Sequence, residues 1–142
     1  GRKLVIAAKV DAVDEQYFES VKPLIDGDQV QLVGEVGFKK KMDLLRHAYA
    51  LLAPIQWEEP FGLNVIEAMA CGTPVLGMAR GSFPEIIDHG KTGFLASTVD
   101  EMATQVNLVN SIDRRVCRKS VEERFTKEIM ASGYLKVYQQ LL

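Results

Sequence analysis

Two acidic residues, Glu59 and Glu67, flank the predicted start of a helix. The helix positions around Glu67 are apolar: Leu63, Val65, Ile66, Ala68 and Met69. A carboxylate among such residues needs a hydrogen-bonding partner or a ligand. The helix is expected to open at Gly62, where free backbone N–H groups and the helix dipole favour an anion such as phosphate. At about 1.5 Å per residue, Glu67 would lie about 7.5 Å further along the same helix.

A carboxylate at that distance from a phosphate suits the vicinal hydroxyls of a ribose, as in dinucleotide sites. Asn64 and Cys71, three positions before and four after Glu67, form with it a narrow polar stripe on the helix. Glu59 would lie on the other side of the anion, where it could accept hydrogen bonds from a sugar carried by a diphosphate. The structural alternatives are a buried Glu67 satisfied by backbone or an Arg, and a surface loop role for Glu59.

The elements that must position these residues alternate along the chain. Strands are predicted at residues 3–8, 30–33, 50–55, 74–79 and 92–96, and helices at 15–25, 42–48, 62–70 and 84–88. Two parallel strands must be joined by a crossover connection, which is usually a helix. The alternation therefore predicts a Rossmann-like α/β fold, a parallel sheet with helices on both faces. The first strand is expected to be buried. From Asp100 onward the pattern is helical and ends in an amphipathic helix.

Two further loops follow predicted strands, at the sheet edge where ligands of parallel sheets bind. The loop 34–37 is rich in glycine but lacks a dinucleotide fingerprint, so a base could lie against the backbone of Gly34 and Val36. The backbone of Gly81 and Ser82 could touch a diphosphate or a sugar. The alternative for Ser82 is a capping box with Glu85 at the start of a short helix.

Composition excludes several classes of function. The length of 142 residues suits one domain, and the formal charge of −2 gives no basic surface for nucleic acid. No apolar run reaches the length of a membrane span, and the N-terminus has no signal-peptide pattern. Cys71 and Cys117 lack the spacing of a metal site or disulfide framework. We therefore expect packed thiols and a cytoplasmic location.

The segment 59–75 resembles the E-x7-E signature of the retaining group 1 (family four) nucleotide-sugar glycosyltransferases. The resemblance continues through residues 80–87 and 90–95, and the alternating layout extends it to essentially the whole chain. It implies the C-terminal, donor-binding half of a two-domain GT-B fold, spanning residues 1–142. It also implies that Glu59 and the backbone of Phe61, Gly62 and Leu63 face the transferred sugar and diphosphate, while Glu67 holds the ribose hydroxyls.

The implied reaction is transfer of a hexose from a nucleoside diphosphate sugar with retention. No metal is predicted, because metal-dependent glycosyltransferases normally carry an Asp-x-Asp pair. The chain departs from the family in lacking the Arg/Lys segment before its first strand, and Arg2 is not assigned that role. Without that segment and an N-terminal acceptor domain, the chain is expected to bind donor weakly and to be inactive alone. The rivals are a same-fold epimerase or phosphorylase and a non-catalytic nucleotide-sugar-binding or scaffold domain.

Overall fold

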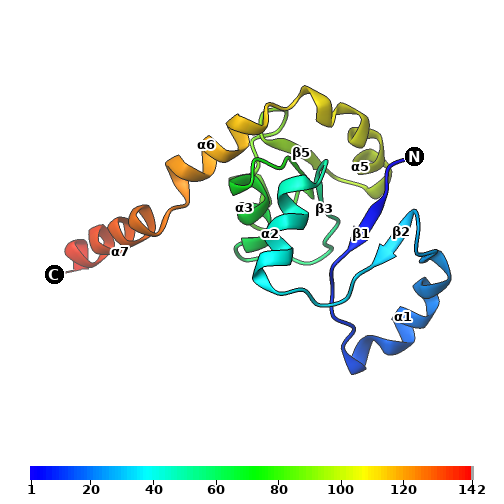
Figure 1. The fold of residues 1–142 in the computed structure, drawn as a ribbon. Coiled ribbons are helices and arrows are strands. Elements are labelled where there is room, and N and C mark those ends of the chain that lie inside the picture. The colour runs from blue at the N-terminus through cyan, green and yellow to red at the C-terminus, as the bar shows by residue number, and fades with distance from the viewer. Residues whose placement is uncertain (142) are drawn as a thin grey trace. The chain divides into compact units, whose positions relative to one another are not determined.

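The computed structural model describes residues 1–141 (Figure 1). It divides the chain into two compact units, and the boundary between them in the sequence follows Asp43. Each unit is described by itself. The first contains β1 (Leu4–Ile6), α1 (Glu15–Val21) with a short 3-10 turn on either side, and β2 (Val30–Leu32). Helix α2 (Phe38–His47) spans the boundary. The single donor-binding domain expected over residues 1–142 stays a prediction.

The first unit is a strand-helix-strand motif with a parallel two-stranded sheet. β1 pairs with β2 in a register that runs from Leu4 opposite Val30 to Ile6 opposite Leu32. None of residues 1–43 is buried, and the side chains of Leu4 and Val5 are 39% and 40% exposed. The predicted strand is confirmed over three residues, but its predicted burial is wrong. Two strands and one short helix cannot enclose a core.

Helix α2 begins earlier than the sequence pattern predicts. The helix was expected over residues 42–48, yet it starts at Phe38 and includes the three lysines at 39–41. The N–H of Lys41 donates to the carbonyl of Gly37 at 3.0 Å, which closes the first turn. Lysine favours the helical conformation. The spacing of apolar residues could not predict this first turn, because its residues are mostly lysines.

The second unit holds a three-stranded parallel sheet in the order β3 (Leu51–Ala53), β4 (Val75–Met78), β5 (Gly93–Ala96). Helix α3 (Leu63–Ala70) connects β3 to β4, α4 (Phe83–Ile86) connects β4 to β5, and α5 (Val99–Gln105) follows β5. The central strand β4 is buried throughout. The predicted Rossmann-like α/β fold is therefore confirmed. The most enclosed core side chains come from these elements: Val65, Met69, Val75, Leu76, Phe83 and Ile87.

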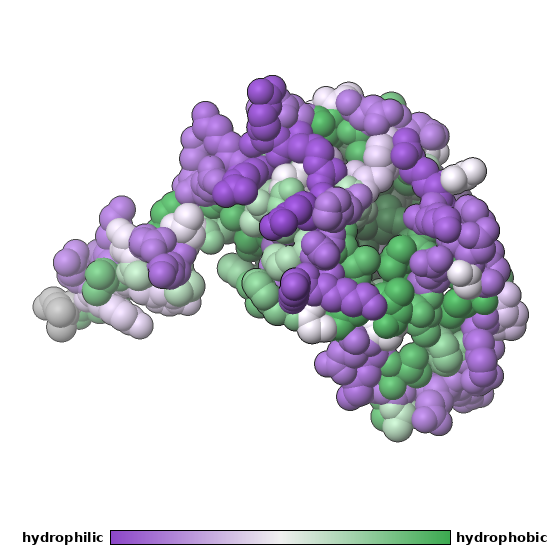
Figure 2. Space-filling model, viewed as in Figure 1, coloured by the Kyte–Doolittle hydropathy of each residue, from purple (hydrophilic) through white to green (hydrophobic). Residues whose placement is uncertain are grey.

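The chain then becomes helical, as predicted. A 3-10 helix (Val106–Ser111) leads to α6 (Arg114–Arg124), which packs against α3 and buries Cys117, and to α7 (Lys127–Leu141). Every residue of α7 is exposed, including Met130, Tyr134 and Tyr138. Figure 2 shows apolar side chains on the surface of this helix at the left of the view. The expected amphipathic helix thus exists, and among residues 1–141 it covers nothing.

Arg114 ties α6 to the elements around it. Its guanidinium donates to the carbonyls of Ala48 and Arg46, both at 2.8 Å, and to the Thr73 hydroxyl at 2.7 Å. These contacts bind the end of α2 and the turn after α3 to the start of α6.

Candidate functional site

Gly62 sets the geometry of the loop that leads from β3 into α3. Its φ of 77° and ψ of 49° lie in the left-handed region that favours glycine. A Cβ at this position would stand 3.0 Å from Cε1 of Phe83, tighter than ordinary contact. The helix opens at Leu63, one residue later than predicted. Among residues 1–141 the N–H groups of Leu63 and Asn64 have no hydrogen-bond partner, so two donors are available at this helix end.

Glu59 turns its carboxylate toward this helix opening. It accepts hydrogen bonds from the N–H of Gly62 at 3.0 Å, from Nε1 of Trp57 at 3.1 Å and from the N–H of Phe61 at 3.4 Å. These donors, Gly62 first, hold the pKa of the Glu59 carboxyl below its ordinary value, because each stabilises the charged form. The N–H groups of Phe61 and Gly62 are therefore already used by Glu59. Those of Leu63 and Asn64 are available.

Glu67 lies at the margin of α3 and not in the core. The core-facing residues of the helix are fully or nearly buried: Val65, Ile66, Ala68 and Met69. Glu67 and Cys71 are half-buried and Asn64 is exposed, which confirms the predicted polar stripe. Glu67 is thus only partly buried, and its alternative role, an acid satisfied by backbone or an Arg, is untested. Its contact with a ribose stays a prediction.

The loop after β4 lies directly beside Glu59. The N–H of Gly81 donates to Oε2 of Glu58 at 2.7 Å, and the N–H of Ser82 donates to the carbonyl of Glu59 at 2.9 Å. The structure thus brings Gly81 and Ser82 to the opening of α3. Because both N–H groups are already paired, a donor contact by these two residues would have to use other atoms.

The alternative capping-box role of Ser82 is wrong. Ser82 precedes α4, but its φ of −75° and ψ of −13° are helical, whereas a capping serine needs an extended backbone. Its hydroxyl makes no cap hydrogen bond and has no partner among residues 1–141, although it is buried. The buried hydroxyl of Ser82 therefore has unused hydrogen-bonding capacity.

Gly34 and Val36 belong to the first unit, while the other candidate residues belong to the second. Gly34 has a φ of 70° and open space where a Cβ would be, and Val36 is half-buried. Their predicted contact with a base stays a prediction.

The expected lack of an Asp-x-Asp pair is wrong. The chain does contain an Asp-x-Asp triplet, at Asp26, Gly27 and Asp28. Oδ1 of Asp26 accepts from the N–H groups of Asp28 and Val30, and Asp28 pairs with Lys3 at 3.0 Å. The triplet therefore builds the turn before β2. No cluster of three His, Cys, Asp or Glu side chains suited to a metal occurs within residues 1–141.

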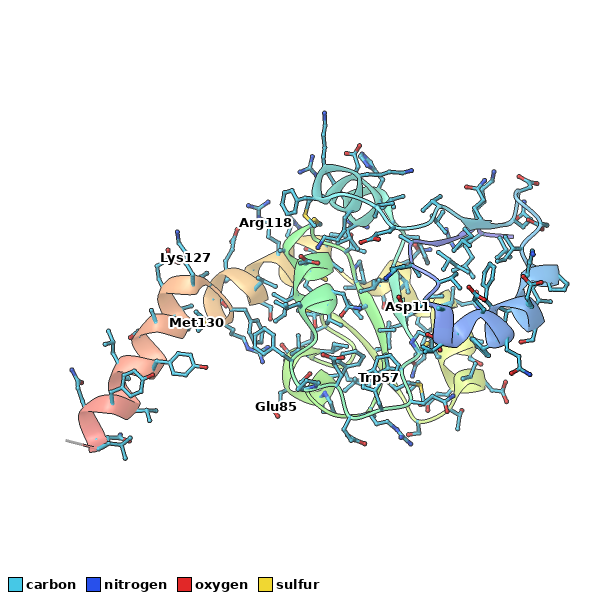
Figure 3. The ribbon with its side chains drawn as sticks, turned by 90° about the horizontal axis from the view of Figure 1, so that it is seen from below. Asp11, Trp57, Glu85, Arg118, Lys127 and Met130 are labelled. Carbon is cyan, nitrogen blue, oxygen red and sulfur yellow. The ribbon has the colours of Figure 1, made fainter. Side chains whose placement is uncertain are left out.

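Two residues of this site were missed from the sequence. Glu58 was passed over because it is one of two adjacent glutamates, and its partner Gly81 is distant in sequence. The N–H of Asn64 was overlooked because only its side chain was considered. Trp57, labelled in Figure 3, lies at the surface of the loop after β3 and is 61% exposed. Its ring nitrogen donates a hydrogen bond to Glu59. His89 accepts a hydrogen bond from the N–H of Leu95 through Nδ1, as part of a turn.

The parallel sheet flanked by helices is a Rossmann-like α/β fold that matches the structures of GT-B glycosyltransferases. The chain belongs to the family described as glycosyl transferases group 1, whose model matches residues 2–124. No helix within residues 1–141 has the length and apolar character needed to cross a membrane.

Among curated proteins, N-acetyl-alpha-D-glucosaminyl L-malate synthase of Bacillus anthracis is 36% identical over 100 residues, covering 65% of this chain and 26% of that protein. The chain therefore spans about a quarter of this relative. Among solved structures, sucrose-phosphate synthase from Thermosynechococcus elongatus has a TM-score of 0.79 at 27% identity, covering 98% of this chain and 38% of that one. Anabaena Alr3699/HepE in complex with UDP has a TM-score of 0.85 at 18% identity, and the match covers 98% of this chain and 41% of that one. At this identity the similarity shows the fold alone.

Proposed function

We propose that the chain binds a nucleoside diphosphate sugar and forms the donor-binding part of a retaining glycosyltransferase that transfers a hexose. The observation that carries the proposal is the opening of α3, where the N–H groups of Leu63 and Asn64 are available beside the ionised Glu59. Such a helix end stabilises a diphosphate. Glu67, about one turn along the same helix, suits ribose hydroxyls. Membership of the group 1 glycosyltransferases supports a sugar-transfer role for this site.

The proposed reaction breaks the bond between the anomeric carbon and a diphosphate oxygen, and the electron pair leaves with the diphosphate. The N–H groups at α3 stabilise that negative charge, while the Glu59 carboxylate faces the sugar where positive charge develops. An acceptor hydroxyl attacks the anomeric carbon from the side that the diphosphate left and passes its proton to the departing diphosphate. Bond breaking and bond making on one face give retention.

We extend the proposal to the whole protein. The length of the relatives supports an N-terminal acceptor domain as the partner of this chain, since the chain covers 26% of one relative and 38% of a solved one. The reaction is proposed to need no resident metal, with the α3 N–H groups neutralising the diphosphate. The two free thiols, Cys71 and Cys117, support a reducing, cytoplasmic compartment.

Binding and product analysis test this proposal separately. Calorimetry of the purified protein with UDP, ADP, GDP and the matching nucleosides is expected to show at least one diphosphate bound about tenfold or more tightly than its nucleoside, since the diphosphate makes charge-assisted hydrogen bonds. NMR of the product made by the whole protein should show the anomeric configuration of the donor. Binding without transfer by the whole protein would favour a scaffold domain, and binding of no nucleotide would refute the proposal.

A further inference from the structure

Glu58 is the acidic residue next to Glu59, and the proposed chemistry gives it no role. Its carboxylate accepts the Gly81 N–H at 2.7 Å, a short hydrogen bond to a charged group. Two neighbouring bonds join the same pair of loops. Nη1 of Arg80 donates to the Gln56 carbonyl at 2.8 Å, and the Ser82 N–H donates to the Glu59 carbonyl at 2.9 Å. We name these three hydrogen bonds the loop latch.

A second feature of the sequence serves the same contact. Gly81 has a φ of 52°, and a Cβ there would lie 2.4 Å from the carbonyl oxygen and 2.5 Å from the nitrogen of Glu59. Real Cβ atoms essentially never approach other atoms within 3.0 Å. Only glycine therefore lets the loop after β4 come this close to the backbone of Glu59. The approach depends on the missing side chain of Gly81 and on the carboxylate of Glu58, which are independent features.

The loop latch determines how Glu59 is held once a donor is bound. In the structure described, the Glu59 side chain is held by the N–H of Gly62 and by Trp57. A sugar that hydrogen bonds to this carboxylate competes with those donors, so the main chain of Glu59 must fix its position. That main chain is bonded to Ser82, and Glu58 holds the adjacent Gly81.

We propose that Glu58 is a positioning residue that acts through Gly81 and the loop after β4 to aim Glu59 at the transferred sugar. This inference rests on the proposed function. In this role Glu58 acts through the hydrogen bond of its Oε2 to Gly81 and not through contact with the donor. Loss of the loop latch should therefore affect recognition of the sugar and leave recognition of the nucleoside diphosphate almost unchanged.

The test compares Glu58→Ala with Glu58→Gln, whose amide oxygen can still accept the Gly81 N–H. Calorimetry gives the dissociation constants of a nucleoside diphosphate and of its hexose derivative for each variant. Glu58→Ala is expected to weaken binding of the sugar nucleotide about tenfold relative to the diphosphate, as for the loss of a hydrogen bond to a charged group. Glu58→Gln should restore most of the sugar recognition, and Gly81→Ala should repeat the loss by forcing the loops apart. Glu128→Ala, an exposed change on α7, is the matched control.

Amide exchange measured by NMR provides a readout that does not depend on ligand. The Gly81 N–H should exchange at least about tenfold faster in Glu58→Ala than in the original protein, and it should stay protected in Glu58→Gln. The inference is overturned if Glu58→Ala keeps its sugar recognition, if Gly81 exchange is unchanged, or if Glu58→Gln loses as much as Glu58→Ala. An original protein that binds neither ligand would instead refute the proposed function, and the positioning role with it.

Discussion

The carboxylate of Glu59 accepts the N–H of Gly62 at 3.0 Å, immediately before the first residue of α3. An acidic side chain and a helix opening thus lie in direct contact, although three sequence positions separate the two residues. The contact stabilises the ionised form of Glu59 and gives the loop a defined shape. A ligand at this helix end must therefore either bind next to the Glu59 carboxylate or displace that carboxylate from the Gly62 N–H.

The hydrogen bonds to Glu59 should make stability depend on pH. Because the folded protein lowers the pKa of this carboxyl below its ordinary value of 4.5, the stabilisation is fully present above about pH 4.5 and is lost as the pH falls through the folded value. We expect Glu59→Gln to be less stable than the original protein at pH 7, and we expect the difference to shrink progressively as the pH falls below 4.5. Urea unfolding followed by the fluorescence of Trp57 measures the stability of both proteins. A difference that stays constant or grows on acidification would contradict this explanation.

Arg114 should contribute far more to stability than its neighbour Arg115. Replacing Arg114 by alanine leaves two carbonyls and the Thr73 hydroxyl without their donor, which should cost about 3 kcal/mol. The side chain of Arg115 is 92% exposed and pairs with Asp113, so Arg115→Ala should cost less than about 1 kcal/mol. Chemical unfolding of both variants gives the comparison. Equal losses would show that Arg114 does not tie the helices together.

The two cysteines should differ sharply in reactivity. Burial raises the pKa of Cys117 to about 11, so roughly one part in a thousand is thiolate at pH 8, whereas Cys71 is half-buried on α3. A thiol reagent such as DTNB at pH 8 should label one cysteine in the folded protein and both in denaturant. In Cys71→Ser, labelling of the folded protein should nearly vanish. Rapid labelling of that variant would show that the Cys117 thiol is reactive in the folded protein, contrary to this prediction.

Local features of the site could be predicted from the sequence because neighbouring residues define them. The opening of α3 follows from Gly62 and the apolar periodicity after it, and Glu59 reaches that opening because only two residues intervene. The family resemblance is local in the same way, since its signature lies within one loop and one helix.

Features that depend on distant residues could not be predicted. The contact of Glu58 with Gly81 joins loops 23 positions apart, and nothing in either loop alone indicates it. The capping box near Ser82 failed because the backbone there is already helical, a property fixed by contacts with the neighbouring loop. The burial predicted for β1 failed because burial depends on the layers around a strand as well as its composition.

The most direct test of the central claim examines Glu67 and the ribose it is proposed to bind. Calorimetry of the purified protein compares a bound nucleoside diphosphate with its 2′,3′-dideoxy analogue. The original protein should prefer the ribose by about tenfold or more, and Glu67→Ala should bind both ligands equally, because the carboxylate that accepts the hydroxyl hydrogens is gone. Glu128→Ala should keep the preference. If Glu67→Ala still prefers the ribose as strongly as the original protein, α3 does not hold the nucleotide as proposed.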